Sequence, residues 1–234
     1  MLNRIAVLGD IHSNGLALDA CLAAIDARGI TTGVCTGDIV MRGPRPDHCV
    51  TALRERGWPC VSGNTDQKVA RADDLPNKKR KLEKVGTRWW TRARLTDRNL
   101  QFITSLPMVQ RLTLGGYRVA VVHGSPDDPT DAMDAETPNE ALISLAHDLD
   151  ADCVVSGHTH RPFVRHVESR LFVNPGSVGE TRNGDLRPCW AWIEATPSGL
   201  EGHLERVDKP LAMVRDKNRK GFMLDHSLAV AGPR

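Results

Sequence analysis

The chain has 234 residues, and its 31 Lys and Arg residues against 29 Asp and Glu residues give a formal net charge of +2. Hydrophobic residues make up 40% and charged residues 26%, which excludes a disordered, collagen-like or coiled-coil chain. The balanced charge offers no overall electrostatic argument for binding nucleic acid. The length favours one large domain, which we expect at residues 1–207, followed by a peripheral tail at 208–234.

The N-terminal segment and the cysteines predict a cytoplasmic protein that does not associate with membranes. Asp10 and His12 interrupt the apolar run after Arg4, so it is shorter than the roughly 7–15 apolar residues of a secretory signal. No other stretch approaches the ~18 apolar residues of a membrane span. The cysteines form no C-x-x-C pair and lie in apolar surroundings, so we expect them to be reduced and buried. They are Cys21, Cys35, Cys49, Cys60, Cys153 and Cys189.

Strand and helix patterns alternate in the first part of the chain. Apolar runs predict strands at 4–8, 33–36 and 59–62, and helical periodicity predicts helices at 16–28 and 46–56. This alternation predicts parallel β-α-β units, whose ligand sites lie beyond the carboxyl ends of the strands. Soon after each expected strand, a glycine precedes a polar residue: Asp10, Asp38 and Asn64.

The segment 67–106 differs in composition, because it is charged and has a helical pattern. We expect a helical insertion, or cap, over one edge of the sheet. Its basic run KKRKLEK, at 78–84, is typical of a solvated helix face, with a phosphate-rich ligand as the alternative. Trp89 and Trp90 are expected to anchor the insertion to the body of the domain.

The second half is expected to return to a sheet. Strands are predicted at 109–114, 117–123, 153–156, 163–167, 171–174, 189–194 and 199–207, with a helix at 139–148. Gly115 and Gly116 fit a two-residue hairpin turn between the first two of these strands. From Asp208 onward, the polar and basic sequence predicts a peripheral helix and then a loose terminus.

Five polar clusters follow expected strands, and together they contain the chemistry of a metal site. They are Asp10-Ile11-His12, Gly37-Asp38, Gly63-Asn64-Thr65-Asp66, His123-Gly124 and Gly157-His158-Thr159-His160. Imidazole nitrogens and carboxylate oxygens without thiolates suit a binuclear centre of divalent cations. In such a centre one carboxylate can bridge the cations, and a shared hydroxide can attack phosphorus in line.

The order of these clusters resembles the calcineurin-like metallophosphoesterase superfamily, whose pattern is D-x-H, G-D, G-N-H-D/E, a lone H and G-H-x-H. Here it reads D-I-H at 10–12, G-D at 37–38, G-N-T-D at 63–66, H at 123 and G-H-T-H at 157–160. The run N-P-G-S-V-G-E-T-R from Asn174 resembles small bacterial phosphodiesterase-like members. The resemblance implies a four-layer α/β/β/α sandwich of two mixed sheets, and a metal-dependent phosphoric ester hydrolase.

The resemblance also implies a ligand set for two divalent metal ions. One ion would be held by Asp10, His12, Asp38 and His160, and the other by Asp38, Asn64, His123 and His158, so that Asp38 bridges them. Asp38 and Asn64, together with Asp66, match positions at the family's catalytic centre. Nitrogen and oxygen ligands suit manganese, iron or zinc. Manganese is the expected metal.

Two arginines are candidates for binding substrate phosphate. The segment G-D-I-V-M-R-G-P resembles phosphoprotein phosphatases and diadenosine tetraphosphatases, in which the arginine matching Arg42 grips phosphate. A guanidinium can donate two parallel hydrogen bonds to phosphate oxygens and stabilise developing charge. The alternative is a surface arginine in a turn. Arg182, after the N-P-G-S run, is a weaker candidate for the same role.

Thr65 departs from the family pattern, which has histidine there as the proton donor to the leaving oxygen. Loss of a general acid typically costs ~10²–10⁴-fold in rate, so we expect a preference for good leaving groups. Aryl esters, phosphoanhydrides, or diesters helped by another acid fit this expectation, and the expected substrate is a small, nucleotide-like phosphate compound. Two alternatives are a catalytically weak or inactive metal-binding scaffold of the same fold and a metal-dependent nuclease.

Overall fold

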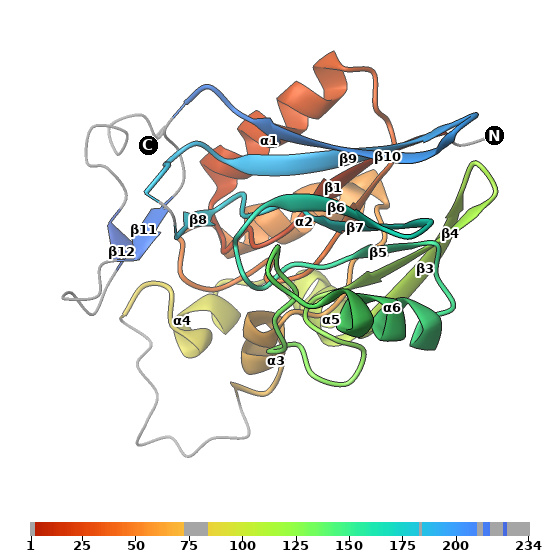
Figure 1. The fold of residues 1–234 in the computed structure, drawn as a ribbon. Helices are drawn as coiled ribbons and strands as arrows, with labels where there is room; N and C mark the ends of the chain where they lie inside the picture. Colours follow the sequence, from red (N-terminus) through yellow and green to blue (C-terminus); the bar gives the residue numbers. More distant parts are fainter. Residues whose placement is uncertain (1–2, 73–83, 183, 210–212, 216–221, 224–234) are drawn as a thin grey trace.

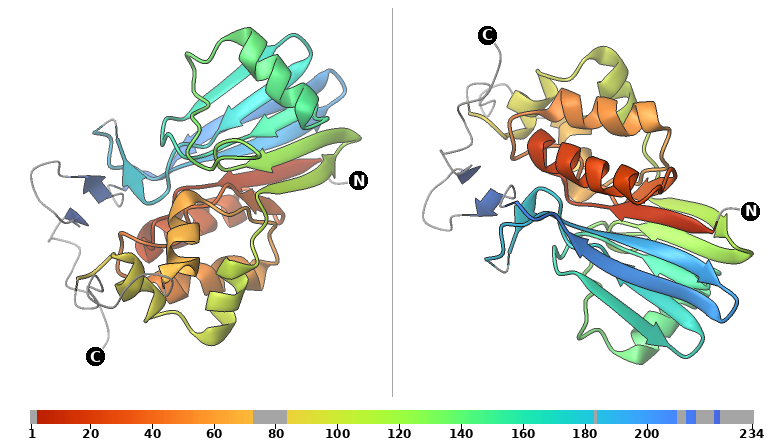
Figure 2. Two further views of the ribbon diagram at one scale, coloured as in Figure 1. Left: turned by 90° about the horizontal axis from the view of Figure 1, so that it is seen from below. Right: turned by 90° about the horizontal axis from the view of Figure 1, so that it is seen from above.

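Two mixed β-sheets lie face to face between layers of helices in a computed structural model of the protein (Figure 1). It describes residues 3–72, 84–182, 184–209, 213–215 and 222–223. The first sheet has the order β10-β9-β1-β2, and the second has the order β3-β4-β5-β7-β6. The predicted four-layer α/β/β/α sandwich is confirmed, and two views at right angles to the first show helices on both outer sides (Figure 2).

The bounds of the elements are close to those expected in most of the chain. The strands of the first sheet are β1 (Arg4–Leu8), β2 (Gly33–Cys35), β9 (Cys189–Thr196) and β10 (Gly199–Arg206). Those of the second are β3 (Val109–Leu114), β4 (Tyr117–Val122), β5 (Cys153–Val155), β6 (Phe163–Val167) and β7 (Arg170–Asn174). The helices are α1 (Gly15–Ala27), α2 (Pro46–Arg56), α3 (Asn64–Ala70), α4 (Arg88–Arg92), α5 (Asp97–Thr104) and α6 (Asn139–Asp148).

Alternation along the central strands builds three hydrophobic cores. In β1, Ala6 and Leu8 pack in the core under α1 and α2, whereas Ile5 and Val7 pack in the core between the sheets. In β4, Val121 packs between the sheets and Val122 packs in the third core, with residues of α6. Successive side chains of a strand point to opposite faces, so each sheet is covered on both sides.

The parallel strand pairs direct the loops that follow them to one edge of the sandwich. β1 runs parallel to β2, and β4, β5 and β7 run parallel to one another. The loops after β1 and β2 are joined directly, because the N–H of Asp10 donates to the carbonyl of Gly37 at 3.0 Å. The loops after β4 and β5 are linked in the same way within the second sheet, since the N–H of Gly157 donates to the carbonyl of His123 at 2.8 Å.

The strand predicted at 59–62 is absent from the sheets that the structure describes. The segment makes a single bridge to β2, at Cys60 opposite Cys35. Pro59 has no N–H to donate, and the N–H of Ser62 donates to the carbonyl of Pro107 instead of to β2. The predicted strand therefore becomes a short connection into α3.

Residues 213–215 and 222–223 of the C-terminal tail form strands, so the predicted peripheral helix is wrong for them. β11 (Met213–Arg215) pairs in parallel with β8 (Glu180–Thr181), and β12 (Phe222–Met223) extends this small third sheet. β8 has two residues, which is too short for any periodicity in the sequence to reveal. Of the basic run at 78–84, only Lys84 lies within the described residues.

The six cysteines are free and buried, as expected. Within the described residues, no helix combines the length and apolar character needed to cross a membrane.

Candidate metal centre

The structure brings the predicted ligands together at the loops that leave the two sheets. Asp10 and His12 follow β1, Asp38 follows β2, and Asn64 is the first residue of α3. His123 follows β4, and His158 and His160 lie between β5 and β6. A positive φ is uncommon outside glycine, and it persists only where the surroundings impose it. It occurs, between 51° and 66°, at Asp10, His12, Asp38, His158 and His160.

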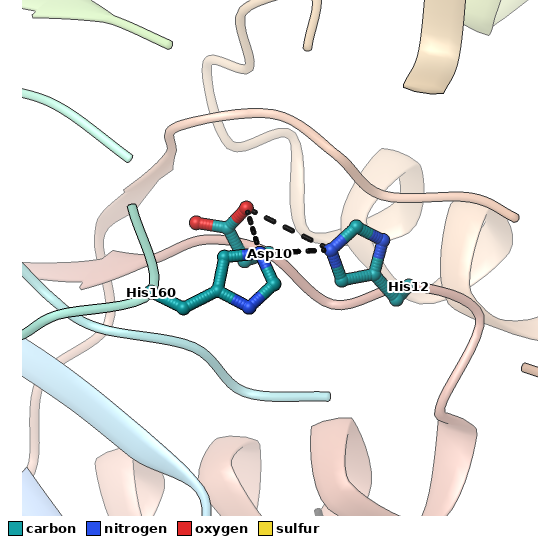
Figure 3. Close-up of side chains that lie close together, drawn as sticks. All are labelled: Asp10, His12 and His160. Atoms are coloured by element: carbon teal, nitrogen blue, oxygen red, sulfur yellow. Dashed lines mark hydrogen bonds and ion pairs between the residues drawn. The ribbon is translucent and has the colours of Figure 1, made fainter. Parts of the chain in front are cut away.

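The first cluster contains Asp10, His12 and His160, all of them buried (Figure 3). His160 Nε2 lies 3.1 Å from Asp10 Oδ1 and 3.1 Å from His12 Nε2. His12 Nε2 lies 3.8 Å from Asp10 Oδ1. Three potential ligand atoms therefore converge from two loops that are far apart in the sequence.

The second cluster contains Asp10, Asp38 and His123. His123 Nε2 lies 3.5 Å from Asp38 Oδ1, while Asp38 Oδ2 lies 3.7 Å from His12 Nε2. Asp38 thus stands between the two clusters, where a bridging carboxylate is expected. Asp10 also belongs to both clusters, whereas the family pattern allots it to one metal.

Backbone carbonyls fix the tautomers of two of the histidines. His123 Nδ1 lies 2.6 Å from the carbonyl oxygen of Thr36, and His160 Nδ1 lies 2.7 Å from that of Glu180. Since a carbonyl only accepts, each Nδ1 carries the proton and each neutral ring keeps a lone pair on Nε2. Such contacts are typical of metal-binding histidines, because they orient the ring toward the metal.

The donor set fits cations better than it fits an apo protein core. The lone pair of His160 Nε2 faces Asp10 Oδ1, which has no hydrogen-bond partner among the described residues. His12 Nδ1 lacks one within the same residues. Buried acceptors that face one another are costly unless a cation or donor lies between them. Imidazole nitrogens and carboxylate oxygens are suitable ligands for manganese, iron or zinc.

His158 lies beside the clusters rather than inside them. Its N–H donates to Asp10 Oδ2 at 3.0 Å, so its backbone holds a carboxylate of the site. Its half-buried ring packs edge-on to that of His123, with 5.3 Å between the centroids. The side chain thus lies next to the second cluster.

Asn64 places its amide next to His123 and Asp38. In one orientation its Oδ1 lies 3.3 Å from His123 Nε2. In the other, the amide nitrogen faces Asp38 Oδ2 at 3.2 Å and the oxygen accepts from Lys68 Nζ at 2.9 Å. A cation at the second cluster would select the first orientation, because it binds the oxygen.

The surroundings of His12 and Asp10 favour their ligand-competent protonation states. Burial holds the pKa of His12 well below its ordinary value, and the charge of Arg42 adds to this. Burial alone would raise the pKa of Asp10, but His160, His123 and Arg42 outweigh it and lower the pKa. For His123, the carboxylates of Asp38 and Asp10 outweigh burial and raise the pKa. A neutral His12 and an ionised Asp10 can both bind a cation.

Thr65 does not direct a proton donor at the clusters. Its hydroxyl donates to the carbonyl of Val40 at 2.9 Å, and its N–H donates to Asp38 Oδ1 at 2.7 Å. The side chain is buried. Position 65 therefore supports the orientation of Asp38 through its backbone, and its hydroxyl is occupied.

Asp66, expected at the catalytic centre, contacts backbone groups instead. Its Oδ1 accepts from the N–H of Val40 at 3.1 Å and its Oδ2 from that of Gly63 at 3.0 Å. Burial and the neighbouring Asp38 raise its pKa to about 7. Asp66 thus connects the loop after β2 to the start of α3, and acts on the site by positioning it.

The two candidate phosphate-binding arginines have different surroundings. Arg42 donates to the carboxylate of Glu180, a fully buried residue of β8. Arg182 is exposed, and its charge contributes to lowering the pKa of His12 and His158, so it lies within electrostatic reach of both. Arg42 is thus fixed beside the ligands, whereas Arg182 lies at the surface.

Sequence reasoning missed Glu180 and Lys68. Glu180 lies in the run V-G-E-T-R, and only the pairing of its side chain with Arg42 distinguishes it. Lys68 lies one helical turn after Asn64, and this i, i+4 spacing on α3 was the available signal.

Residues 4–196 match the family model of the calcineurin-like phosphoesterase superfamily domain. The chain belongs to this superfamily. A related but uncharacterized protein of Methanocaldococcus jannaschii is 33% identical over 199 residues, which are 78% of this chain and 79% of that protein. A probable metallophosphoesterase of Methanothermobacter thermautotrophicus is 34% identical over 105 residues, 45% of this chain and 56% of the relative.

A solved structure extends the similarity within the phosphoesterase superfamily. The crystal structure of a metallophosphoesterase from Sphaerobacter thermophilus has a TM-score of 0.70 and 29% sequence identity to this chain. The similarity covers 89% of each chain.

Proposed function

We propose that this superfamily member is a phosphoesterase that depends on two divalent metal ions. The observation that carries the proposal is the convergence of Asp10, His12, Asp38, His123 and His160, with lone pairs directed at one another inside the protein. Asn64 and His158 complete the proposed ligand set at the second cluster. Manganese is the proposed metal, with iron or zinc as the alternatives.

Each part of the site has a role in phosphoester hydrolysis. Bound divalent cations would supply positive charge for the phosphoryl oxygens and make a water molecule acidic enough to react near neutral pH. Arg42, beside the ligands, would hold two phosphoryl oxygens through its planar guanidinium. Arg182 would contact the exposed part of the substrate. Asp38 and Asp10 would keep the ligand histidines aligned across the two clusters.

The surroundings of Thr65 favour substrates with good leaving groups. Its hydroxyl donates to the carbonyl of Val40, so it is not available to protonate a departing alkoxide. The proposed substrates are small and nucleotide-like: phosphodiesters, nucleotides or dinucleoside polyphosphates. Such compounds include anhydrides, whose leaving phosphate needs no proton at the moment of cleavage.

A metal-binding and activity experiment tests the function. The protein is loaded with Mn²⁺, desalted and analysed by elemental mass spectrometry, and assayed on p-nitrophenyl phosphate, bis-p-nitrophenyl phosphate, cyclic nucleotides and dinucleoside polyphosphates. We expect about two equivalents of metal and turnover that chelator abolishes. Asp38→Asn should lose at least one equivalent of metal and at least ~10²-fold in rate, because a change to an outer contact of a metal ligand alone typically costs about 10–100-fold.

His166→Gln is the matched control, since this histidine is exposed on β6. It should keep the metal content and the rate. Metal binding without turnover of any substrate would favour the alternative of a metal-binding scaffold. A rate on nucleic acid that falls steeply with salt would favour the nuclease instead.

We also infer a cytoplasmic location. Six buried, unpaired thiols are typical of proteins kept in a reducing compartment.

A further inference from the structure

Arg42 is held at both its backbone and its side chain. It has a φ of 72°, and its N–H donates to the carbonyl of Gly86 at 3.0 Å. Its guanidinium donates to Glu180 Oε2. The side chain of Arg42 is 15% exposed and that of Glu180 is fully buried. The pair therefore lies at the margin of the protein interior, with the arginine on the solvent side.

Glu180 also contacts the metal ligands through its main chain. Its carbonyl accepts from His160 Nδ1 at 2.7 Å, and its N–H donates to Ser177 Oγ at 2.9 Å. The hydroxyl of Ser177 in turn donates to the carbonyl of Asp10 at 2.7 Å. One residue of β8 thus supports two metal ligands with its backbone and Arg42 with its carboxylate.

The carboxylate of Glu180 fixes the orientation of the Arg42 guanidinium. A guanidinium has five N–H donors in a rigid plane, so a contact on one edge sets the direction of the other edges. A long side chain that is already oriented loses less conformational freedom when it binds an anion. A buried carboxylate is costly without a cationic partner, so Arg42 and Glu180 constrain each other.

We propose that Glu180 is a positioning residue that orients the guanidinium of Arg42 toward the phosphate of the substrate, beside His160. This inference rests on the proposed function, because it assigns a phosphate to the region next to the metal ligands. Glu180 acts only through Arg42 and does not touch the substrate.

The first test is Glu180→Gln, which removes the charge and keeps the shape. We expect KM to rise about tenfold while kcat changes less than about threefold, because the ground-state grip on phosphate is weakened and the metal ligands stay in place. The affinity of the Mn²⁺-loaded protein for inorganic phosphate, measured by calorimetry, should fall by a similar factor. Metal content should not change. Glu194→Gln, which breaks a pair with Arg4 on the first sheet, should change none of these values.

The second test is a double-mutant cycle with Arg42→Gln. If Glu180 acts through Arg42, adding Glu180→Gln to Arg42→Gln will change neither KM nor phosphate affinity further. Additive effects would overturn the proposal. A fall in KM for Glu180→Gln would also overturn it, because Glu180 would then compete with the substrate for Arg42.

A second variant and a measurement without turnover keep the tests decisive. If Glu180→Gln does not fold, Glu180→Asp keeps the charge but shortens the side chain, and should also weaken phosphate binding. Phosphate affinity is measured without turnover. A wild-type protein that binds phosphate but cleaves no ester therefore leaves the role of Glu180 testable while contradicting the proposed function.

Discussion

Unusual backbone angles at single residues bring the candidate ligands into place. Asp10 and His12 both have positive φ, as do His158 and His160, so each pair turns its side chains into the site from an irregular loop. The motifs D-I-H and G-H-T-H identified these residues in the sequence, but the sequence does not reveal a left-handed backbone at non-glycine positions. Strain of this kind requires surroundings that hold it, and it is common at functional sites.

At the residue scale, Thr65 gives a prediction about leaving groups. Thr65→His introduces a proton donor at the position where the family has one, and we expect the rate on an alkyl phosphate ester to rise at least ~10-fold. The rate on p-nitrophenyl esters should change little, because that leaving group needs no proton. Steady-state rates on the two ester types provide the measurement.

Thr65→Ser is the control, since serine keeps the hydroxyl that donates to Val40. It should leave both rates unchanged. No gain for Thr65→His on alkyl esters would show that position 65 does not determine the choice of leaving group.

At the scale of elements, segments with a local sequence pattern were mostly predictable, whereas segments that depend on tertiary contacts were not. The bounds of β1, α2, β3, α6 and β6 coincide with the patterns in the sequence. The segment at 59–62 looked like a strand because it is apolar, but Pro59 and the bond from Ser62 to Pro107 divert its backbone. β8 and its partner β11 depend on tertiary pairing that no local pattern records.

Gly86, just before α4, contacts the loop that carries Arg42, and this contact gives the second prediction. Gly86 has a φ of 78°, and a Cβ there would lie 2.3 Å from the carbonyl oxygen of Arg42. Gly86→Ala should displace the Arg42 loop, so we expect KM to rise at least about threefold at unchanged metal content. Steady-state kinetics and elemental analysis provide the measurements.

Gly57→Ala is the matched control for Gly86→Ala. Gly57 has a similar φ of 64°, but a Cβ there would meet nothing within 4 Å. Both variants carry the left-handed strain of alanine, which costs about 1 kcal/mol. A KM that changes equally in both would show that strain, rather than contact with Arg42, is responsible.

At the scale of the whole molecule, the site joins the two sheets. Asp10 and Asp38 come from the first sheet, whereas His123, His158 and His160 come from the second. Divalent ions bound between them would therefore link both halves of the sandwich. The family pattern predicted which residues are involved, but their placement across two sheets follows from strand order, which depends on long-range pairing.

Metal removal should consequently destabilise the entire domain. Mn²⁺ at about 100 times its Kd should stabilise the protein by about 2.7 kcal/mol, which corresponds to a rise in Tm of about 5–10 °C at this size. Calorimetry with and without chelator measures the rise in Tm. Hydrogen exchange should show that bound Mn²⁺ adds protection in both β1 and β4. Asp38→Asn should remove most of the shift, and protection confined to one sheet would contradict the linkage.

The position of β9 beside β1 has a consequence for biosynthesis. Ile5 pairs with Ile193, and the carboxylate of Asp10 accepts from the backbone of His158. In a nascent chain, the edge of β1 that pairs with β9 therefore stays open until nearly all of the domain has left the ribosome. Contacts of such wide sequence separation form slowly. The ligand cluster can assemble only after His160 has left the ribosome, so metal loading belongs to the second half of synthesis or later.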